Sequence, residues 1–210
     1  MPVSISGSGT ISGVSVGGLP DGIVDADMLA TDSVQTAKIV AKAATAAKLG
    51  NGAILQVQNK TFTSWDAATV TANSWWDVAA SSTFEVDITP ISASNKIFVF
   101  GHVYMSCSNV NTLSFVKIRR DSTDIGQGDS SSSRRQVNGA MYCEDEYHFV
   151  PLNFSCLDSP SSTSSLKYAV NIGHWSSSNR TFYINRSITD SNDYGNPRAA
   201  SSITAMEIAQ

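Results

Sequence analysis

The sequence predicts an all-β fold: a C-terminal β-sandwich or jelly-roll-like domain, preceded by a repeat-built stalk and an N-terminal β-arm. The sandwich is predicted by short alternating apolar runs that continue from residue 54 to the C-terminus. Gly, Pro, Asn and Ser separate these runs, and no helical periodicity is present there. A third observation, an apolar repeat with five-residue spacing, lies upstream of the runs and predicts that several copies of the chain associate.

Residues 1–18 alternate apolar and small side chains, as a β-strand does. The segment is too short and too rich in Gly to fold alone, so we expect it to add to another sheet or to intertwine with copies of itself. We interpret it as an anchor arm, with a disordered tail as the alternative. It lacks the charged and apolar regions of a secretory signal, and we therefore expect folding in a cytoplasm.

Residues 19–53 carry the five-residue repeat. A residue five positions along a helix lies about 140° away, and on a strand it lies on the opposite face. Neither element keeps the row on one side, so we predict a stalk in which several copies surround a common axis. An ordinary short helix over residues 34–48 is the alternative, and it would also need partner copies. The predicted stalk core is Leu19, Val24, Leu29, Val34, Ile39, Ala44, Leu49 and Ile54.

Residues 54–210 contain about nine or ten predicted strands, each a short run bounded by turn residues. The run at 84–88 alternates cleanly and stops before Pro90, and the run at 95–105 is the most apolar, which predicts a central strand. For Trp75 and Trp76, alternation predicts one ring inside and one outside. The predicted strands are residues 54–63, 68–72, 75–79, 84–88, 95–105, 112–119, one or two within 139–156, 165–175, 180–184 and 201–208.

The densest group of possible metal ligands is CEDEYH at residues 143–148. A strand there would place Glu144, Glu146 and His148 on one face, and a solvated acidic strand edge is the alternative. The three histidines fall on separate predicted strands, and no GxSxG motif is present. We predict no catalytic residue, no metal site, no cofactor and no enzymatic activity.

Three cysteines, at positions 107, 143 and 156, form no CxxC motif. An odd number of cysteines in a β-protein that folds in a cytoplasm predicts buried thiols rather than a disulfide framework.

Two polar segments, residues 121–137 and 187–198, are predicted loops, and several aromatic residues flank predicted turns. Polar loops on a rigid β scaffold often bind partners, and exposed rings stack on sugars or anchor protein interfaces. Plain surface loops and rings packed in the core or at a subunit interface are the alternatives. The predicted receptor contacts are Asp129, Arg134, Arg135, Trp175, Asn192 and Tyr194.

The charge pattern excludes some partners. The net charge is −4, and no run of Lys or Arg exceeds two residues, so we expect no nucleic-acid partner. No apolar run approaches the roughly 20 residues that a membrane-spanning helix needs, so we expect no membrane insertion.

Four stretches, in this order, resemble the tail fibre proteins of tailed bacteriophages of the marine and cyanobacterial type. TAKIVAKAATAAKLGNGAILQV resembles the degenerate ten-residue repeats that lead into their β-domain. FEVDITPISASNKIFV, LDSPSSTSSLKY and the final NRS and ASSITAMEI resemble successive parts of that domain. The resemblance covers residues 22–210 and implies a trimeric virion fibre or virion-surface protein. Residues 1–18 lie outside it.

We therefore predict a homotrimeric structural and adhesive virion protein that is assembled in the host cytoplasm. Residues 1–18 would bind other virion proteins, residues 19–53 would trimerise, and residues 54–210 would contact a glycan or protein on the host surface. The alternatives are a trimeric capsid decoration or cement protein, a small glycan-cleaving head, and a C1q-like or lectin module from outside viruses.

Overall fold

A computed structural model describes residues 45, 48–108, 111–145 and 147–210. The chain divides into two compact units, Met1–Thr45 and Ala46–Gln210, and we call the second the head domain. The predicted arm and most of the predicted stalk lie outside the described residues, and of the stalk core only Leu49 and Ile54 lie within them. Among the described residues, no helix is long and apolar enough to cross a bilayer.

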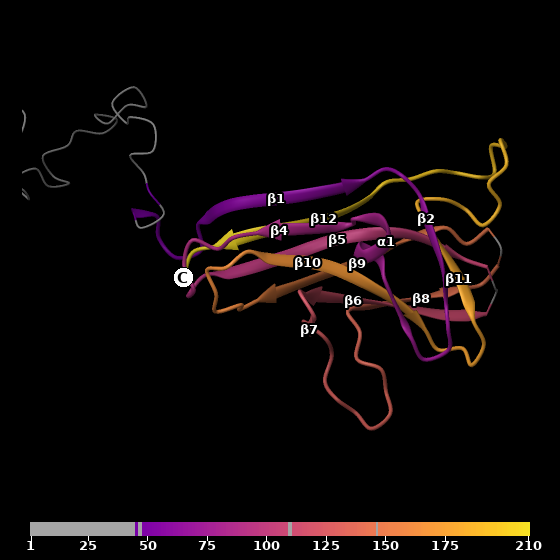
Figure 1. The fold of residues 1–210 in the computed structure, drawn as a ribbon, viewed down its shortest axis with the longest axis horizontal. Helices are drawn as coiled ribbons and strands as arrows, with labels where there is room; N and C mark the ends of the chain where they lie inside the picture. Colours follow the sequence, from indigo (N-terminus) through magenta and orange to yellow (C-terminus); the bar gives the residue numbers. More distant parts are fainter. Residues whose placement is uncertain (1–44, 46–47, 109–110, 146) are drawn as a thin grey trace, which may run out of the picture. The chain divides into compact units, whose positions relative to one another are not determined.

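The head domain is a sandwich of two antiparallel sheets (Figure 1). The predicted all-β fold class is therefore confirmed. Sheet A contains β1 (Ile54–Phe62), β2 (Asp66–Val70), β5 (Lys96–Cys107), β9 (Val150–Asp158), β11 (Arg180–Ile184) and β12 (Ser201–Ile208). Sheet B contains β3 (Trp75–Asp77), β4 (Glu85–Ile88), β6 (Thr112–Arg120), β7 (Thr123–Ile125), β8 (Gly139–Cys143) and β10 (Leu166–His174).

Strand β5 is the centre of sheet A, as its apolar sequence predicts. One edge of β5 pairs first with β12 and then with β11, and the other edge pairs with β9 along most of its length. Strand β1 extends the sheet beyond β12, and β2 extends it beyond β11. In sheet B, β10 and β6 form the middle, with β4 and β3 beside β10 and with β7 and β8 beside β6.

The core lies between the two sheets. Alternation along each strand turns every second side chain inward, where apolar burial stabilises the fold. Trp76 is buried and Trp75 is half-buried, so the predicted opposite orientation of these two rings is confirmed. The inward residues of the central strands are fully buried in one cluster, which includes Ile97, Val99, Val103, Met105, Val116, Ile118, Val170 and Ile172.

Gly101 occupies an inward position of β5 that has no room for a side chain. A Cβ atom there would lie 2.1 Å from the carbonyl oxygen of Ser202 and 2.9 Å from the ring of Phe154. We expect Gly101→Ala to lower the free energy of unfolding by about 1–3 kcal/mol, because neither neighbour can move without disturbing a strand. Urea denaturation checks this. Gly128→Ala is the control, because no atom lies within 4 Å of its added carbon. Equal effects of the two substitutions would contradict the packing argument.

Two short elements are absent from the sequence prediction. The predicted strand 75–79 ends at Asp77, whose carboxylate accepts a hydrogen bond from the Ala79 amide and starts α1 (Val78–Ser82). Such a helix is too short to show a helical period. Within the predicted loop 121–137, a turn with Asp121 at φ 51° reverses the chain, so that β7 pairs with β6.

The prediction of a strand face containing Glu144 and His148 is wrong. Both residues lie in the connection between β8 and β9, and Glu146 is outside the described residues. Asp145 makes a turn there, since its carboxylate accepts a hydrogen bond from the Tyr147 amide at 2.9 Å. Local hydrogen bonding by this aspartate competes with strand pairing. His148 is therefore in a connection, whereas His102 and His174 lie on β5 and β10 as predicted.

Candidate functional site

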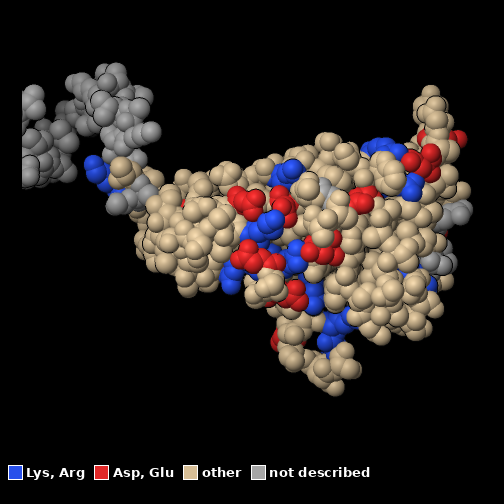
Figure 2. Space-filling view, viewed as in Figure 1, with Lys and Arg blue, Asp and Glu red and all other residues tan. Residues whose placement is uncertain are grey.

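The outer face of sheet B carries charges that are paired across strands. Lys117 Nζ lies 2.7 Å from Asp124 Oδ2, and Lys167 Nζ lies 2.6 Å from Glu85 Oε1. A third ion pair joins Arg119 to Asp77. Figure 2 shows acidic and basic side chains together across the middle of this face. Solvated ion pairs of this kind suit a surface that faces water.

The outer face of sheet A instead carries a row of apolar side chains, while the next registers toward the end of β1 contain polar residues such as Asn59, Thr204 and Asn153. A row that crosses four strands in register consists of Val57, Met206, Phe98 and Leu157. Val57 and Leu157 are 50% and 53% exposed, and the Phe98 ring stacks on Phe100 with centroids 5.3 Å apart. We define the apolar face of sheet A by its outward residues Ile54, Val57, Phe98, Phe100, Leu157, Met206 and Ile208. Contiguous exposed apolar surface on a folded protein is a candidate interaction site.

The head domain has two distinct ends. The Gly52 amide donates to the Ala209 carbonyl, and the Ala209 amide donates to the Ala53 carbonyl, each at 2.9 Å. The start of the described domain and its C-terminus therefore share one end, which we call the terminal end (left in Figure 1). Because β1, β8 and β10 run away from this end, the connections that follow them meet at the opposite end, which we call the loop end. The connection that follows β11 lies there too, since Asn185 Nδ2 donates to the carbonyl oxygens of Phe62 and Ser64, at and just beyond the end of β1.

The exposed large apolar side chains of the head domain lie in different regions according to whether they are aliphatic or aromatic. The aliphatic ones lie at the terminal end or on the apolar face of sheet A, namely Leu49, Ile54, Val57, Ile91 and Leu157. The aromatic ones lie at the loop end, namely Trp65, Tyr142, Tyr147, Trp175 and Tyr194. Aliphatic side chains are suited to stable burial, and aromatic rings with polar neighbours are suited to contacts with sugars or proteins.

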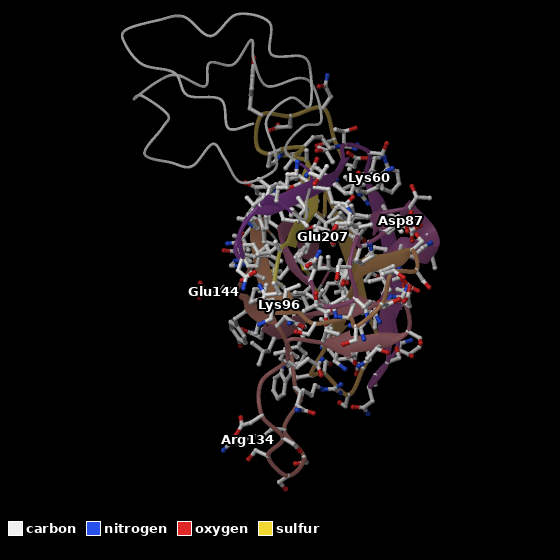
Figure 3. All side chains as sticks on the ribbon, turned by 90° about the vertical axis from the view of Figure 1, so that its left-hand side faces the viewer. Lys60, Asp87, Lys96, Arg134, Glu144 and Glu207 are labelled. Atoms are coloured by element: carbon white, nitrogen blue, oxygen red, sulfur yellow. The ribbon has the colours of Figure 1, made fainter. Side chains whose placement is uncertain are left out.

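The six predicted receptor contacts do not form one surface. Trp175, Asn192 and Tyr194 are exposed residues at the loop end, and Trp175 directly follows β10. The other three belong to the connection between β7 and β8, which projects from the side of the sandwich (Figures 1 and 3). Arg135 of that connection packs back on the domain, since its Nη2 donates to Asn73 Oδ1 at 2.7 Å.

A cluster at the loop end contains residues that sequence reasoning did not select as contacts. The Arg186 guanidinium lies between the rings of Trp65 and Tyr183, at 4.7 and 4.3 Å from their centroids. Arg186 pairs with Arg198 in an isolated β-bridge, and Asp190 forms ion pairs with both arginines. These contacts fix the base of the 187–198 loop. The bridge and the shared ion pairs with Asp190 bring the two arginines together, and no local sequence pattern indicates the bridge.

The cysteine thiols of the head domain have raised pKa values or lie buried. Burial raises the pKa of the Cys156 thiol to about 11, with a smaller contribution from Asp158, and a hydrogen bond with Cys107 and burial raise the pKa of Cys143. A thiolate is the reactive form of cysteine, so these groups are chemically quiet at neutral pH. Cys107 and Cys143 are buried, as predicted, and Cys156 is half-buried.

The grooves of the head domain are shallow and open to solvent. One of about 370 Å³ lies between β2 and β3, beside Trp75 and Asp77. The Asp77 carboxylate is already bound to Arg119 and to the first turn of α1. In the described part of the chain, no group of three or more His, Cys, Asp or Glu side chains is placed to hold a metal ion.

Comparison with known proteins yields only distant similarities. The sequence matches none of the protein-family models and none of the curated proteins with which it was compared. The solved structures that it resembles include infectious bursal disease virus of the Gt strain, with TM-score 0.39, 12% identity, and coverage of 73% of this chain and 42% of that one. Another is the VP2 subviral particle of the same virus, with TM-score 0.39, 12% identity, and coverage of 74% and 38%.

The chain thus spans less than half the length of these structures. TM-scores of this size do not establish a common fold. No tail-fibre family is shown by any of these comparisons, and that resemblance stays a prediction.

Proposed function

We propose that this chain is a structural and adhesive virion protein, a homotrimeric fibre that is assembled in the host cytoplasm. It would attach to the particle through residues 1–18 and would contact a host-surface glycan or protein with the loop end of its head domain. The observation that carries the proposal is the sorting of exposed apolar side chains, with aliphatic ones at the terminal end and on one sheet face and aromatic ones at the loop end.

The loop end is the contact surface that this sorting favours. It lies opposite the end at which the described domain begins, so its residues are the ones farthest from the chain's entry into the head domain. Trp175 is 59% exposed, and Tyr147 and Tyr194 are more exposed still. Three copies of such a surface multiply weak contacts through avidity, because the second and third contacts become intramolecular.

A binding experiment on bacterial cells tests the proposal. The full chain, fluorescently labelled, is incubated with a panel of strains that includes cyanobacteria. We expect saturable binding to at least one strain and a loss of at least about tenfold when Tyr147, Trp175 and Tyr194 are all replaced by Ala, because avidity amplifies each lost contact. The matched variant Asp129→Ala with Arg134→Ala, in the connection between β7 and β8, is expected to bind within about twofold of the unmodified chain.

Two results would overturn the proposed contact surface or the proposed role. Loss of binding only in the Asp129 and Arg134 variant would place the contact on the side of the sandwich. Failure of the unmodified chain to bind any strain would remove the adhesive role and would favour a capsid decoration protein, which needs a trimer but no receptor.

A further inference from the structure

Strand β5 has large apolar side chains on both of its faces near its start. Ile97, Val99 and Val103 point into the core and are fully buried, whereas Phe98 and Phe100 point outward and are only half-buried. A strand with apolar residues on both faces is typical of a sheet that is covered on both sides, and a sheet with one face in water alternates apolar and polar residues instead. The outward face of β5 therefore has the composition of a covered surface.

The apolar face extends across the sheet and toward the chain's entry. Met206 joins Val57 to Phe98 in one continuous row, and Ile54 pairs with Ile208 at the terminal end of the same face. Ile54 is also the last residue of the five-residue repeat, and it is 56% exposed. The last residue of the apolar row predicted to hold several copies together is thus also a residue of the apolar face of sheet A.

The charges of this face fit association with identical copies. The paired outward positions of β1, β12, β5 and β9, all of them described, contain no carboxylate, and their basic side chains are Lys96 and His102. Lys96 lies at the start of β5, at the terminal end (Figure 3). The row of Val57, Met206, Phe98 and Leu157 carries no charge, so identical copies can meet on it without burying like charges or leaving a carboxylate unpaired. The charged outer face of sheet B cannot meet copies of itself in this way.

We propose that the apolar face of sheet A packs against two further copies of this chain around a three-fold axis, so that the head domain contributes its own trimer interface. The inference takes the number of copies from the proposed function. Val57, Phe98, Leu157 and Met206 then hold the copies together in addition to residues 19–53. The charged face of sheet B and the loop end then remain in water.

The reactivity of Met206 in the full chain tests this interface. The initial rate at which hydrogen peroxide oxidises Met206 is measured by mass spectrometry, in parallel with the mass of the particle by light scattering. We expect a mass of about three times 22.3 kDa and a slow reaction of Met206, because a neighbouring copy covers it. In the variant Val57→Asp with Leu157→Asp, we expect oxidation to be at least about tenfold faster, because carboxylates on the face separate the copies there.

The control places the same charges on the other sheet. Ala140 and Tyr142 are exposed residues on the outer side of β8, and the variant Ala140→Asp with Tyr142→Asp is expected to leave the rate at Met206 unchanged. The rate in the urea-unfolded chain gives the unprotected reference, so protection in the unmodified chain is measurable even if a variant fails to fold.

Three other results of this experiment would contradict the proposed head interface. A trimer in which Met206 of the unmodified chain reacts as fast as in the Val57 and Leu157 variant would overturn the head interface and leave the proposed function standing. Slow oxidation in that variant as well would mean that something other than a second copy covers Met206, which also overturns the inference. A monomeric mass for the unmodified chain would remove both the interface and the trimeric fibre.

Discussion

Replacing Arg120 with alanine is expected to lower the free energy of unfolding of the head domain by about 3–5 kcal/mol, because it leaves a buried carboxylate without its cation. Arg120 Nη1 donates to both oxygens of Asp158, at 2.8 and 2.7 Å, and the Asp158 side chain is only 9% exposed. The Tyr168 hydroxyl donates to the same carboxylate at 2.7 Å. Arg120 and Tyr168 belong to sheet B and Asp158 belongs to sheet A, so these bonds join the two layers.

Tyr168 cannot replace the lost arginine. Burial, followed by the hydrogen bond to Asp158, raises the pKa of Tyr168 above its usual value, so the ring remains a neutral donor at any ordinary pH. The arginine is thus the partner that balances the charge of Asp158. Urea denaturation followed by tryptophan fluorescence measures the loss.

Arg119→Ala is the matched control for this experiment. Arg119 is the preceding residue on the same strand, but it points to the outer face of sheet B and pairs with Asp77, which is 34% exposed. Loss of such a partly exposed pair is expected to cost about 1 kcal/mol or less. Similar losses for the two variants would show that the inward position of Arg120 has no special role.

Replacing Glu207 with alanine is expected to cost about 3–4 kcal/mol, because three donors lose a charged acceptor. Glu207 is fully buried, and in the described part of the chain no ion pair involves it. Its Oε1 accepts from the Ile91 amide and from Asn95 Nδ2, each at 2.7 Å, and its Oε2 accepts from Gln56 Nε2 at 2.6 Å. The carboxylate thus holds the 89–95 connection against β1 and β12 at the terminal end.

Glu207→Gln separates the effect of charge from that of size. The amide keeps the volume of the side chain but offers one oxygen acceptor in place of two, so one of the three donors must face its NH₂ group. We expect a loss of about half that of the alanine variant in the same urea titration. An alanine variant as stable as the unmodified chain would show that water or rearranged neighbours satisfy these donors without Glu207.

Much of the head domain could be predicted from its sequence, because strand alternation is a local property. Strands β11 and β12 have the predicted bounds, and β5 is the central strand that its apolar run indicates. The failures are short elements. Helix α1 and strand β7 are too brief to show a period, and the turn at Asp145 depends on a side-chain hydrogen bond that composition does not reveal.

The candidate contact surfaces were predicted less well, for a different physical reason. The loops at 121–137 and 187–198 are polar and partly exposed as expected, but their positions on the sandwich follow from the pairing of distant strands. The connection between β7 and β8 leaves the side of the domain, whereas the 187–198 loop is held at the loop end by the bridge between Arg186 and Arg198. The sequence of either loop does not indicate whether that loop lies on the side of the sandwich or at the loop end.

By itself, the sequence determined the all-β class of residues 54–210, most of the strands and the side of each strand that is apolar, since the period of two follows from backbone geometry alone. Only the tertiary structure decided which apolar sides meet in the core and which remain outside. The row of Val57, Met206, Phe98 and Leu157 is assembled from four strands that lie far apart in the chain, and their register is set by hydrogen bonds between those strands. An apolar side chain looks the same in a sequence whether another layer of the same chain covers it or a second molecule does.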